Sequence, residues 1–163
     1  MRVLGIDPGS LCTGWGVVAG SPHSPSMVDC GEIRLGSSKP LSERLSQLRI
    51  ELEEVVRRFE PEAAAVETPF HGANARSALR LAHARGVVLA VLGGLGIPVS
   101  EYTPATVKQS VTGNGRAEKG QVEIMVTRLL SLERPPGGAD RADALAIALC
   151  HLTRASSAAA ELR

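Results

Sequence analysis

Four acidic residues stand where an ordinary core or surface does not require them. Asp7 ends the apolar run "RVLGI", and Glu67 ends a second apolar run, "AAAV". Asp140 and Asp143 lie three residues apart at the start of "DRADALAIALCHL", so they share one face of a helix. An isolated ionised carboxylate is costly to bury, and neighbouring carboxylates repel each other. A divalent cation held between such groups removes both costs.

These four acids form a set of hard oxygen ligands without histidine or cysteine. Such a set suits Mg²⁺ or Mn²⁺ better than zinc. Two such ions held close together can activate water and stabilise the leaving oxygen in phosphodiester cleavage. The pattern therefore predicts a two-metal hydrolytic site, provided that the fold brings the four side chains to one place.

Each acid also has a simpler explanation when it is considered alone. Asp7 begins an Asp-Pro-Gly turn, and Glu67 can be a surface residue at the end of a strand. Asp140 can cap a helix, and Asp143 can be a first-turn acid favoured by the helix dipole. Only the joint placement of the four residues favours a metal site.

The composition bounds the class of protein. With 163 residues, 44% apolar and 21% charged, the chain suits one globular domain with a proper core. The net charge of +1 hides an asymmetry, because residues 71–128 hold seven of the 18 Lys and Arg residues and only three of the 17 Asp and Glu residues. This basic part favours an anionic partner, and a solvated surface is the competing interpretation.

The cysteines and the apolar runs indicate the compartment. Cys12, Cys30 and Cys150 are far apart and lack metal-site spacing, so we expect reduced thiols in a cytoplasm. No apolar stretch reaches the roughly 18 residues of a membrane span, and the N-terminus enters a strand directly. We therefore expect a soluble intracellular protein without membrane contact.

Hydrophobic periodicity predicts an α/β protein. Strands are expected at 2–7, 13–20, 26–35, 63–67 and 97–103. Helices are expected at 40–61, 74–96, 104–113, 121–132 and 140–152, with a flexible basic loop at 113–121 and a fraying tail after 152. A hairpin of three strands, followed by alternating strands and helices, predicts a mixed sheet covered on both faces. Ligand sites of such sheets lie at the carboxyl ends of the parallel strands.

Six segments, in their order and spacing, resemble the RuvC family of Holliday-junction resolvases. They are "GIDPGS", "TGWGVV", "AAAVE", "NARSALRLAHARGVV", "VKQSVTGNGRAEKGQV" and "ADRADALAIAL". The resemblance runs from residue 2 to about 152. It implies an RNase H-like fold with a five-stranded mixed sheet, forming a single nuclease domain over residues 1–155 with a short tail at 156–163.

The resemblance also implies an activity and partners. Members act in DNA recombination and repair as homodimeric endodeoxyribonucleases that cut four-way DNA junctions by paired, symmetric nicks. They use Mg²⁺, two ions per site in our interpretation, and we expect Mn²⁺ to substitute. The RuvA–RuvB branch-migration complex is an expected partner. The helix at 74–94, with Gly86, is the dimer interface by resemblance, and core packing is the alternative.

Individual residues follow from the same resemblance. The family's four catalytic acids match Asp7, Glu67, Asp140 and Asp143, although some members carry histidine at the position of Asp140. Basic catalytic positions match Lys108 and Lys119, and an aromatic residue that stacks on junction bases matches Phe70, for which a core position is the alternative. Lys119 is expected to stabilise phosphate charge and Lys108 to hold the DNA backbone nearby. Further candidates for DNA contacts are Asn74, Arg76 and Arg116; for the two arginines a solvated surface position is the competing interpretation.

Three other functions share some of these features. Actin-like and sugar-kinase ATPases begin with a similar strand and turn, but they enclose a nucleotide between two such domains. An RNase H-like nuclease that processes ribosomal RNA precursors would share the sheet and the first aspartate. The segments "GNGRAEKGQV" and "DRADALAIAL" favour the resolvase over it. A junction-binding module without catalysis is disfavoured by the four intact acids.

Overall fold

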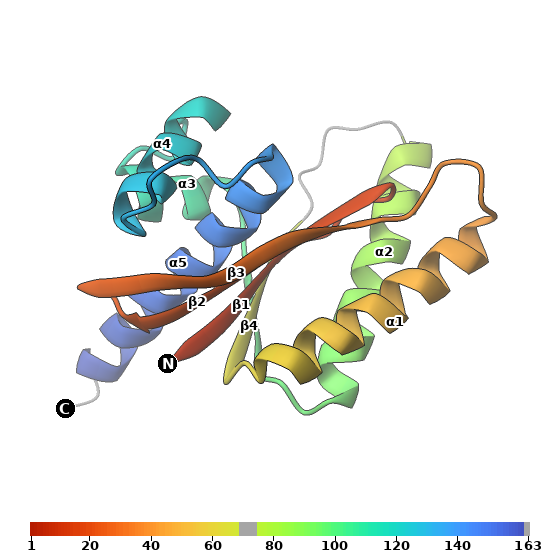
Figure 1. Cartoon of the computed structure of the whole chain (residues 1–163), viewed down its shortest axis with the longest axis horizontal. Coiled ribbons are helices and arrows are strands. Elements are labelled where there is room, and N and C mark those ends of the chain that lie inside the picture. The colour runs from red at the N-terminus through yellow and green to blue at the C-terminus, as the bar shows by residue number, and fades with distance from the viewer. Residues whose placement is uncertain (69–74, 162–163) are drawn as a thin grey trace.

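The computed structural model of the chain describes residues 1–68 and 75–161, with side chains up to residue 155 (Figure 1). The strands are β1 (Arg2–Asp7), β2 (Cys12–Ser21), β3 (Ser24–Arg34), β4 (Ala63–Glu67) and β5 (Val99–Tyr102). The helices are α1 (Leu41–Phe59), α2 (Ala75–Gly94), α3 (Pro104–Thr112), α4 (Lys119–Leu129) and α5 (Ala139–Glu161).

The strands form one five-stranded sheet in the order β3-β2-β1-β4-β5. Strands β1, β2 and β3 are antiparallel neighbours, whereas β1, β4 and β5 run parallel. Helices α1 and α2 cover one face of the sheet, and α3, α4 and α5 cover the other (Figure 1). The predicted mixed sheet with helices on both faces is therefore confirmed.

The alternation of side chains along the central strands builds a separate core on each face. Leu4, Ile6 and Val66 belong to the core under α1 and α2, whereas Val3 and Ala65 belong to the core under α5. Side chains two residues apart in a strand share a face. The residues that end the two strands therefore fall on the α5 face.

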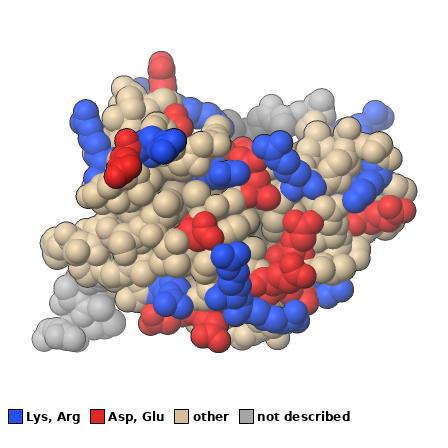
Figure 2. Space-filling model, viewed as in Figure 1, with Lys and Arg blue, Asp and Glu red and all other residues tan. Residues whose placement is uncertain are grey.

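Helix α1 shows how the apolar period divides a helix into two sides. Leu48, Leu52 and Phe59 are buried against the sheet. The opposite side carries charges of both signs, which Figure 2 shows interspersed over this helix, and Glu53 forms ion pairs with Arg49 and Arg57. Mixed charges with ion pairs four residues apart are typical of a solvated helix face.

Helix α5 lies unusually close to the sheet because glycines face it. A Cβ atom added to Gly5 would lie 2.1 Å from the main-chain oxygen of Ala144, and one added to Gly14 would lie 2.1 Å from that of Asp140. Real Cβ atoms do not approach so closely, so the backbone of α5 rests directly on β1 and β2. These two glycines set the height of α5 above the sheet.

Two predicted helix boundaries were wrong. Lys119 was expected in a loop but is the first residue of α4, because Glu118 and Gln121 form a reciprocal capping box around that helix start. Helix α5 was expected to end at Leu152 and instead continues to Glu161. Residues 153–161 contain neither glycine nor proline, so nothing in the sequence stops the helix there.

The cysteines match the expectation of free thiols. Cys12 and Cys30 are half-buried and Cys150 is buried, and none of the three forms a disulfide. Within the described ranges, every helix falls short of the length and apolar character that crossing a membrane requires.

The close approach of α5 predicts opposite effects for two glycine-to-alanine changes. Gly5→Ala should lower the free energy of unfolding by about 1–3 kcal/mol, because the new methyl group overpacks against the α5 backbone. Gly120→Ala, in α4 with open space around it, should raise it by about 0.5–1 kcal/mol. Urea unfolding measures both. A Gly5→Ala variant as stable as the parent would show that α5 does not rest on β1.

Candidate active site

The site begins with two acids at the ends of neighbouring parallel strands. Ile6 of β1 pairs with Val66 of β4, so the next residues, Asp7 and Glu67, follow side by side at the carboxyl edge of the sheet. Both are only partly exposed. The convergence expected from two separated apolar runs therefore depends on β1 and β4 being adjacent, which the sheet order provides.

A pocket of about 270 Å³ opens beside these two acids, between the sheet edge and helices α3, α4 and α5. Its charged lining residues are Asp7, Glu67, Lys108, Lys119 and Asp143. Five of the six predicted catalytic residues therefore share one pocket. They come from five different elements, which only the tertiary fold can bring together.

Burial and repulsion make the two strand-end acids hard to ionise. Burial raises the pKa of Asp7 to about 7, and the neighbouring charges of Glu67, Asp143 and Asp140 add to the rise, while Lys119 opposes it. The pKa of Glu67 is also raised to about 7, again mainly by burial and then by Asp143. The pocket thus concentrates more negative charge than its own two lysines offset.

Lys119 of α4 contacts Asp143, the acid that α5 contributes to the pocket. Its Nζ donates a hydrogen bond of 2.9 Å to Oδ2 of Asp143, and this contact raises the pKa of Lys119. The Lys119 side chain remains 72% exposed, whereas that of Asp143 is 24% exposed. Lys119 therefore keeps its charge and can also reach an anion that enters the pocket.

Asp140 lies beside the pocket rather than among its lining residues. Its charge still raises the pKa of Asp7, so the two carboxylates interact. Its own partner is the Cys12 thiol, whose pKa rises to about 12 through burial and through the hydrogen bond to Asp140. The structure therefore adds Cys12, to which the sequence had assigned only a free thiol, as a residue that contacts a predicted catalytic acid.

The pocket has the chemistry of a divalent-cation site. All its acidic ligands are carboxylates, which Mg²⁺ and Mn²⁺ prefer, and the raised pKa values of Asp7 and Glu67 show the repulsion that such a cation would relieve. As the side chains lie, no three His, Cys, Asp or Glu residues in the described part of the chain form a ready ligand group. In this arrangement the ammonium group of Lys119 supplies the positive charge beside Asp143.

A second, smaller pocket of about 90 Å³ shares Asp7 and Glu67 as a wall. Arg85 of α2 lines it and forms an ion pair with Glu101 of β5. In the sequence, Arg85 is distinguished only as one of the basic residues of 71–128. Arg85 lies in α2 and Glu67 ends β4, and no sequence pattern connects the two positions. Only the packing of α2 on the sheet brings Arg85 to this pocket.

Apart from Lys108 and Lys119, which line the larger pocket, the predicted DNA-contact residues divide into two groups. Arg76, in the first turn of α2, and Arg116, before α4, are exposed and line neither of the pockets that contain the acids. Phe70 and Asn74 lie outside the described residues, so their assignments stay predictions.

Sequence comparison identifies known proteins that are similar to this chain over nearly its whole length. Residues 3–151 match the family described as "Crossover junction endodeoxyribonuclease RuvC". Relatives of that name from Chlorobaculum parvum and Magnetococcus marinus are 51% and 46% identical to the chain over 96% and 94% of its length, and the alignments cover 84% and 85% of those proteins.

Solved structures give the same result. RuvC of T. thermophilus, in complex with a Holliday junction substrate, superposes with a TM-score of 0.92 at 37% identity over 97% of this chain and 96% of that one. The yeast mitochondrial Holliday junction resolvase Ydc2 superposes with a TM-score of 0.66 at 16% identity over 92% of this chain and 77% of that one, a likeness of fold alone. The expected RNase H-like fold is thereby confirmed.

The raised pKa values predict how stability depends on pH without metal. Folded Asp7 keeps its proton up to about pH 7, whereas an unfolded aspartate loses it near 3.8. The folded state therefore binds more protons between these values, and stability falls as the pH rises through them. Asp7→Asn should be more stable than the parent by about 1–3 kcal/mol at pH 8 and nearly equal to it at pH 4.

Denaturant unfolding in a chelating buffer at both pH values measures this difference. The control is Glu54→Gln, which removes an exposed carboxylate from α1 and should change stability by less than about 0.5 kcal/mol at either pH. An equal effect of Asp7→Asn at pH 4 and pH 8 would contradict the proposed burial of charge at Asp7.

Proposed function

Because the chain belongs to the crossover junction endodeoxyribonuclease RuvC family, we propose that it resolves Holliday junctions by hydrolysing one phosphodiester bond in each of two strands. The observation that carries the proposal is the pocket in which Asp7, Glu67 and Asp143 face Lys108 and Lys119. Phosphodiester hydrolysis requires carboxylates that hold metal ions and, beside them, cationic side chains that bind phosphate. The junction-bound T. thermophilus relative supports a four-way DNA substrate.

We propose two Mg²⁺ ions per site, with Mn²⁺ able to substitute. The charge of Asp7 interacts with those of Glu67, Asp143 and Asp140, so these four carboxylates would together hold the ions. Ions bound there would lower the pKa of an attacking water and offset the charge of the phosphate. The protein's part is to keep the four carboxylates ionised, oriented and aimed at one phosphodiester.

The two lysines act on the phosphate rather than on the water. Lys119 stays protonated, and its exposed ammonium group can contact the scissile phosphate as negative charge develops on it. Lys108, presented by α3 across the same pocket, can hold an adjacent part of the DNA backbone. Phe70 and Asn74 follow Glu67 in sequence, and we propose base stacking for Phe70 and backbone contact for Asn74.

A homodimer fits the symmetry of the substrate. A four-way junction has two equivalent strands to cut, and a two-fold pair of chains presents one site to each. Helix α2 offers a surface of small exposed residues, Ala82, Gly86, Ala90 and Gly93, which permits close approach of a second backbone. We propose this surface as the dimer interface, and Arg76 and Arg116 as phosphate contacts beyond the active pocket.

The remaining assignments follow from the substrate. The RuvA–RuvB branch-migration complex is the proposed partner, because the family resemblance implies it. A DNA substrate and three free cysteines fit a reducing cytoplasm.

Incubation with a synthetic mobile four-way junction and Mg²⁺ tests the activity directly. We expect paired nicks at symmetric positions, and loss of cutting with retained junction binding in Asp7→Asn. The matched control is Asp29→Asn, since Asp29 lies on β3 and pairs with Arg58 away from the pocket. Single or asymmetric nicks, or normal cutting by Asp7→Asn, would contradict the proposal.

Replacing Lys119 separates catalysis from binding. Lys119→Ala should slow cleavage of the bound junction by about 10²–10³, the usual effect of removing one group that stabilises transition-state charge. Its junction affinity should fall by much less. Lys39→Ala is the control, because Lys39 contacts Gln47 and lines neither acid-containing pocket. Single-turnover cleavage and a binding titration measure the two effects, and equal losses in both would assign Lys119 to affinity alone.

A further inference from the structure

A row of paired residues runs across three neighbouring strands beneath the start of α5. Asp7 of β1 pairs with Gly14 of β2, and Gly14 pairs with Glu32 of β3. Directly paired residues of neighbouring strands point to the same face of a sheet. Glu32 therefore projects toward α5, as Asp7 does, with a glycine between them.

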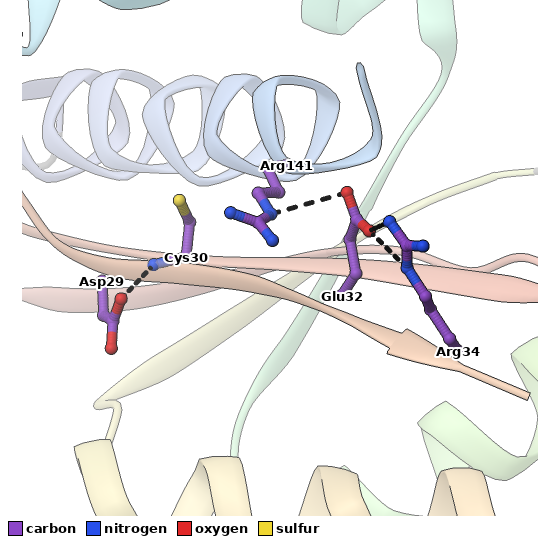
Figure 3. A network of polar contacts seen from close by, with 5 residues as sticks. All are labelled: Asp29, Cys30, Glu32, Arg34 and Arg141. Carbon is purple, nitrogen blue, oxygen red and sulfur yellow. Dashed lines mark hydrogen bonds and ion pairs between the residues drawn. The ribbon is translucent and has the colours of Figure 1, made fainter. Parts of the chain in front are cut away.

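Glu32 is an acidic side chain that the fold has largely removed from water. It is 8% exposed, and its Oε2 accepts hydrogen bonds from Nε and Nη2 of Arg34 at 2.9 and 2.6 Å. Its other oxygen, Oε1, forms an ion pair with Nε of Arg141 at 3.5 Å. Figure 3 shows Arg141 reaching down from α5 to Glu32, with Arg34 on the opposite side of the carboxylate.

The two arginines differ in what they connect. Arg34 belongs to the same strand as Glu32, and its side chain is 79% exposed, so this contact ties β3 only to itself. Arg141 belongs to the first turn of α5, between the predicted ligands Asp140 and Asp143. Its Nε atom is buried and finds no hydrogen-bond partner among the described residues, so the Glu32 ion pair is the polar interaction that balances this part of the guanidinium.

The backbone before α5 is fitted around the same carboxylate. A Cβ atom added to Gly138 would lie 2.5 Å from Oε1 of Glu32, so the chain enters the helix in direct contact with this side chain. In the same row, one strand nearer to Asp7, the main chain of Asp140 rests on Gly14. Glu32 thus contacts Gly138, just before α5, and Arg141, in the first turn of α5; these two residues flank Asp140 in the sequence.

We propose that Glu32 is a positioning residue for the active site: its ion pair with Arg141 holds the first turn of α5 at the height and rotation that direct Asp140 and Asp143 toward Asp7. The inference rests on the proposed function for what those acids do. A carboxylate ligand must be held in one orientation to bind a metal ion, and partners one shell further out supply that constraint. Glu32 supplies it through the helix rather than by touching the ligands.

The alternative is that the two arginines only balance the charge of the buried Glu32 carboxylate, so that either of them serves equally well. Two arginine variants separate these explanations, because both remove one cation from the same carboxylate. Arg141→Met removes the contact with α5, whereas Arg34→Met removes only the contact within β3. Arg141→Lys keeps the charge within reach of Glu32.

The experiment combines single-turnover cleavage of bound junctions, the Mg²⁺ concentration for half-maximal cleavage, junction affinity, and hydrogen–deuterium exchange of residues 139–145 without metal. Glu32→Gln and Arg141→Met should cleave about 10–100-fold more slowly and require more Mg²⁺. Their junction affinity should stay within about twofold, and their α5 amides should exchange roughly tenfold faster. Arg34→Met should match the parent in all four measurements, and Arg141→Lys should recover most of the cleavage rate.

Two results would overturn the inference. One is unchanged cleavage, Mg²⁺ requirement and exchange in Glu32→Gln. The other is an equal effect of Arg34→Met and Arg141→Met, which would assign Glu32 to charge balance alone. If the parent protein itself left junctions uncut, the proposed function would fail, and the exchange of residues 139–145 would still decide whether Glu32 holds α5.

Discussion

The repulsion among buried carboxylates at one sheet edge is the constraint on which the rest of the structure depends. Asp7 and Glu67 end adjacent parallel strands, and Asp143 faces them from α5, so the fold accepts a concentration of negative charge that works against its own stability. A core that served stability alone would place apolar residues there. Burial and like-charge repulsion together raise the pKa of both strand-end acids, and a bound cation would favour their ionised form.

The surrounding elements are organised to hold those charges in place. Glycines in β1 and β2 let the backbone of α5 lie directly on the sheet, so Asp140 and Asp143, near the start of the helix, cannot move away without lifting it. Cys12 contacts Asp140, Lys119 contacts Asp143, and Glu32 contacts the turn that carries both. Each contact joins α5 to a different element, and together they oppose the outward movement that repulsion between like charges favours.

Membership of the RuvC family explains why acids and lysines are gathered in one pocket. Cutting a four-way junction requires metal ligands and phosphate-binding cations in one pocket, and the two lysines come from α3 and α4 on the same side as α5. The opposite face, formed by α1 and α2, carries mixed surface charges on α1 and small exposed residues on α2. The two faces are thus suited to different tasks, catalysis on one and, as we propose, pairing with a second chain on the other.

The sequence by itself determined the elements and the chemical types of the site, because local patterns encode both. Apolar periods marked the strands and helices, and carboxylates ending apolar runs marked Asp7 and Glu67. It missed the start of α4 at Lys119, which a Glu118–Gln121 capping box sets, and it read the Ala-rich end of α5 as a tail. Only the tertiary structure decided that Cys12, Glu32 and Arg85 lie near the acids, since strand pairing and helix packing bring them there from positions that no local period connects.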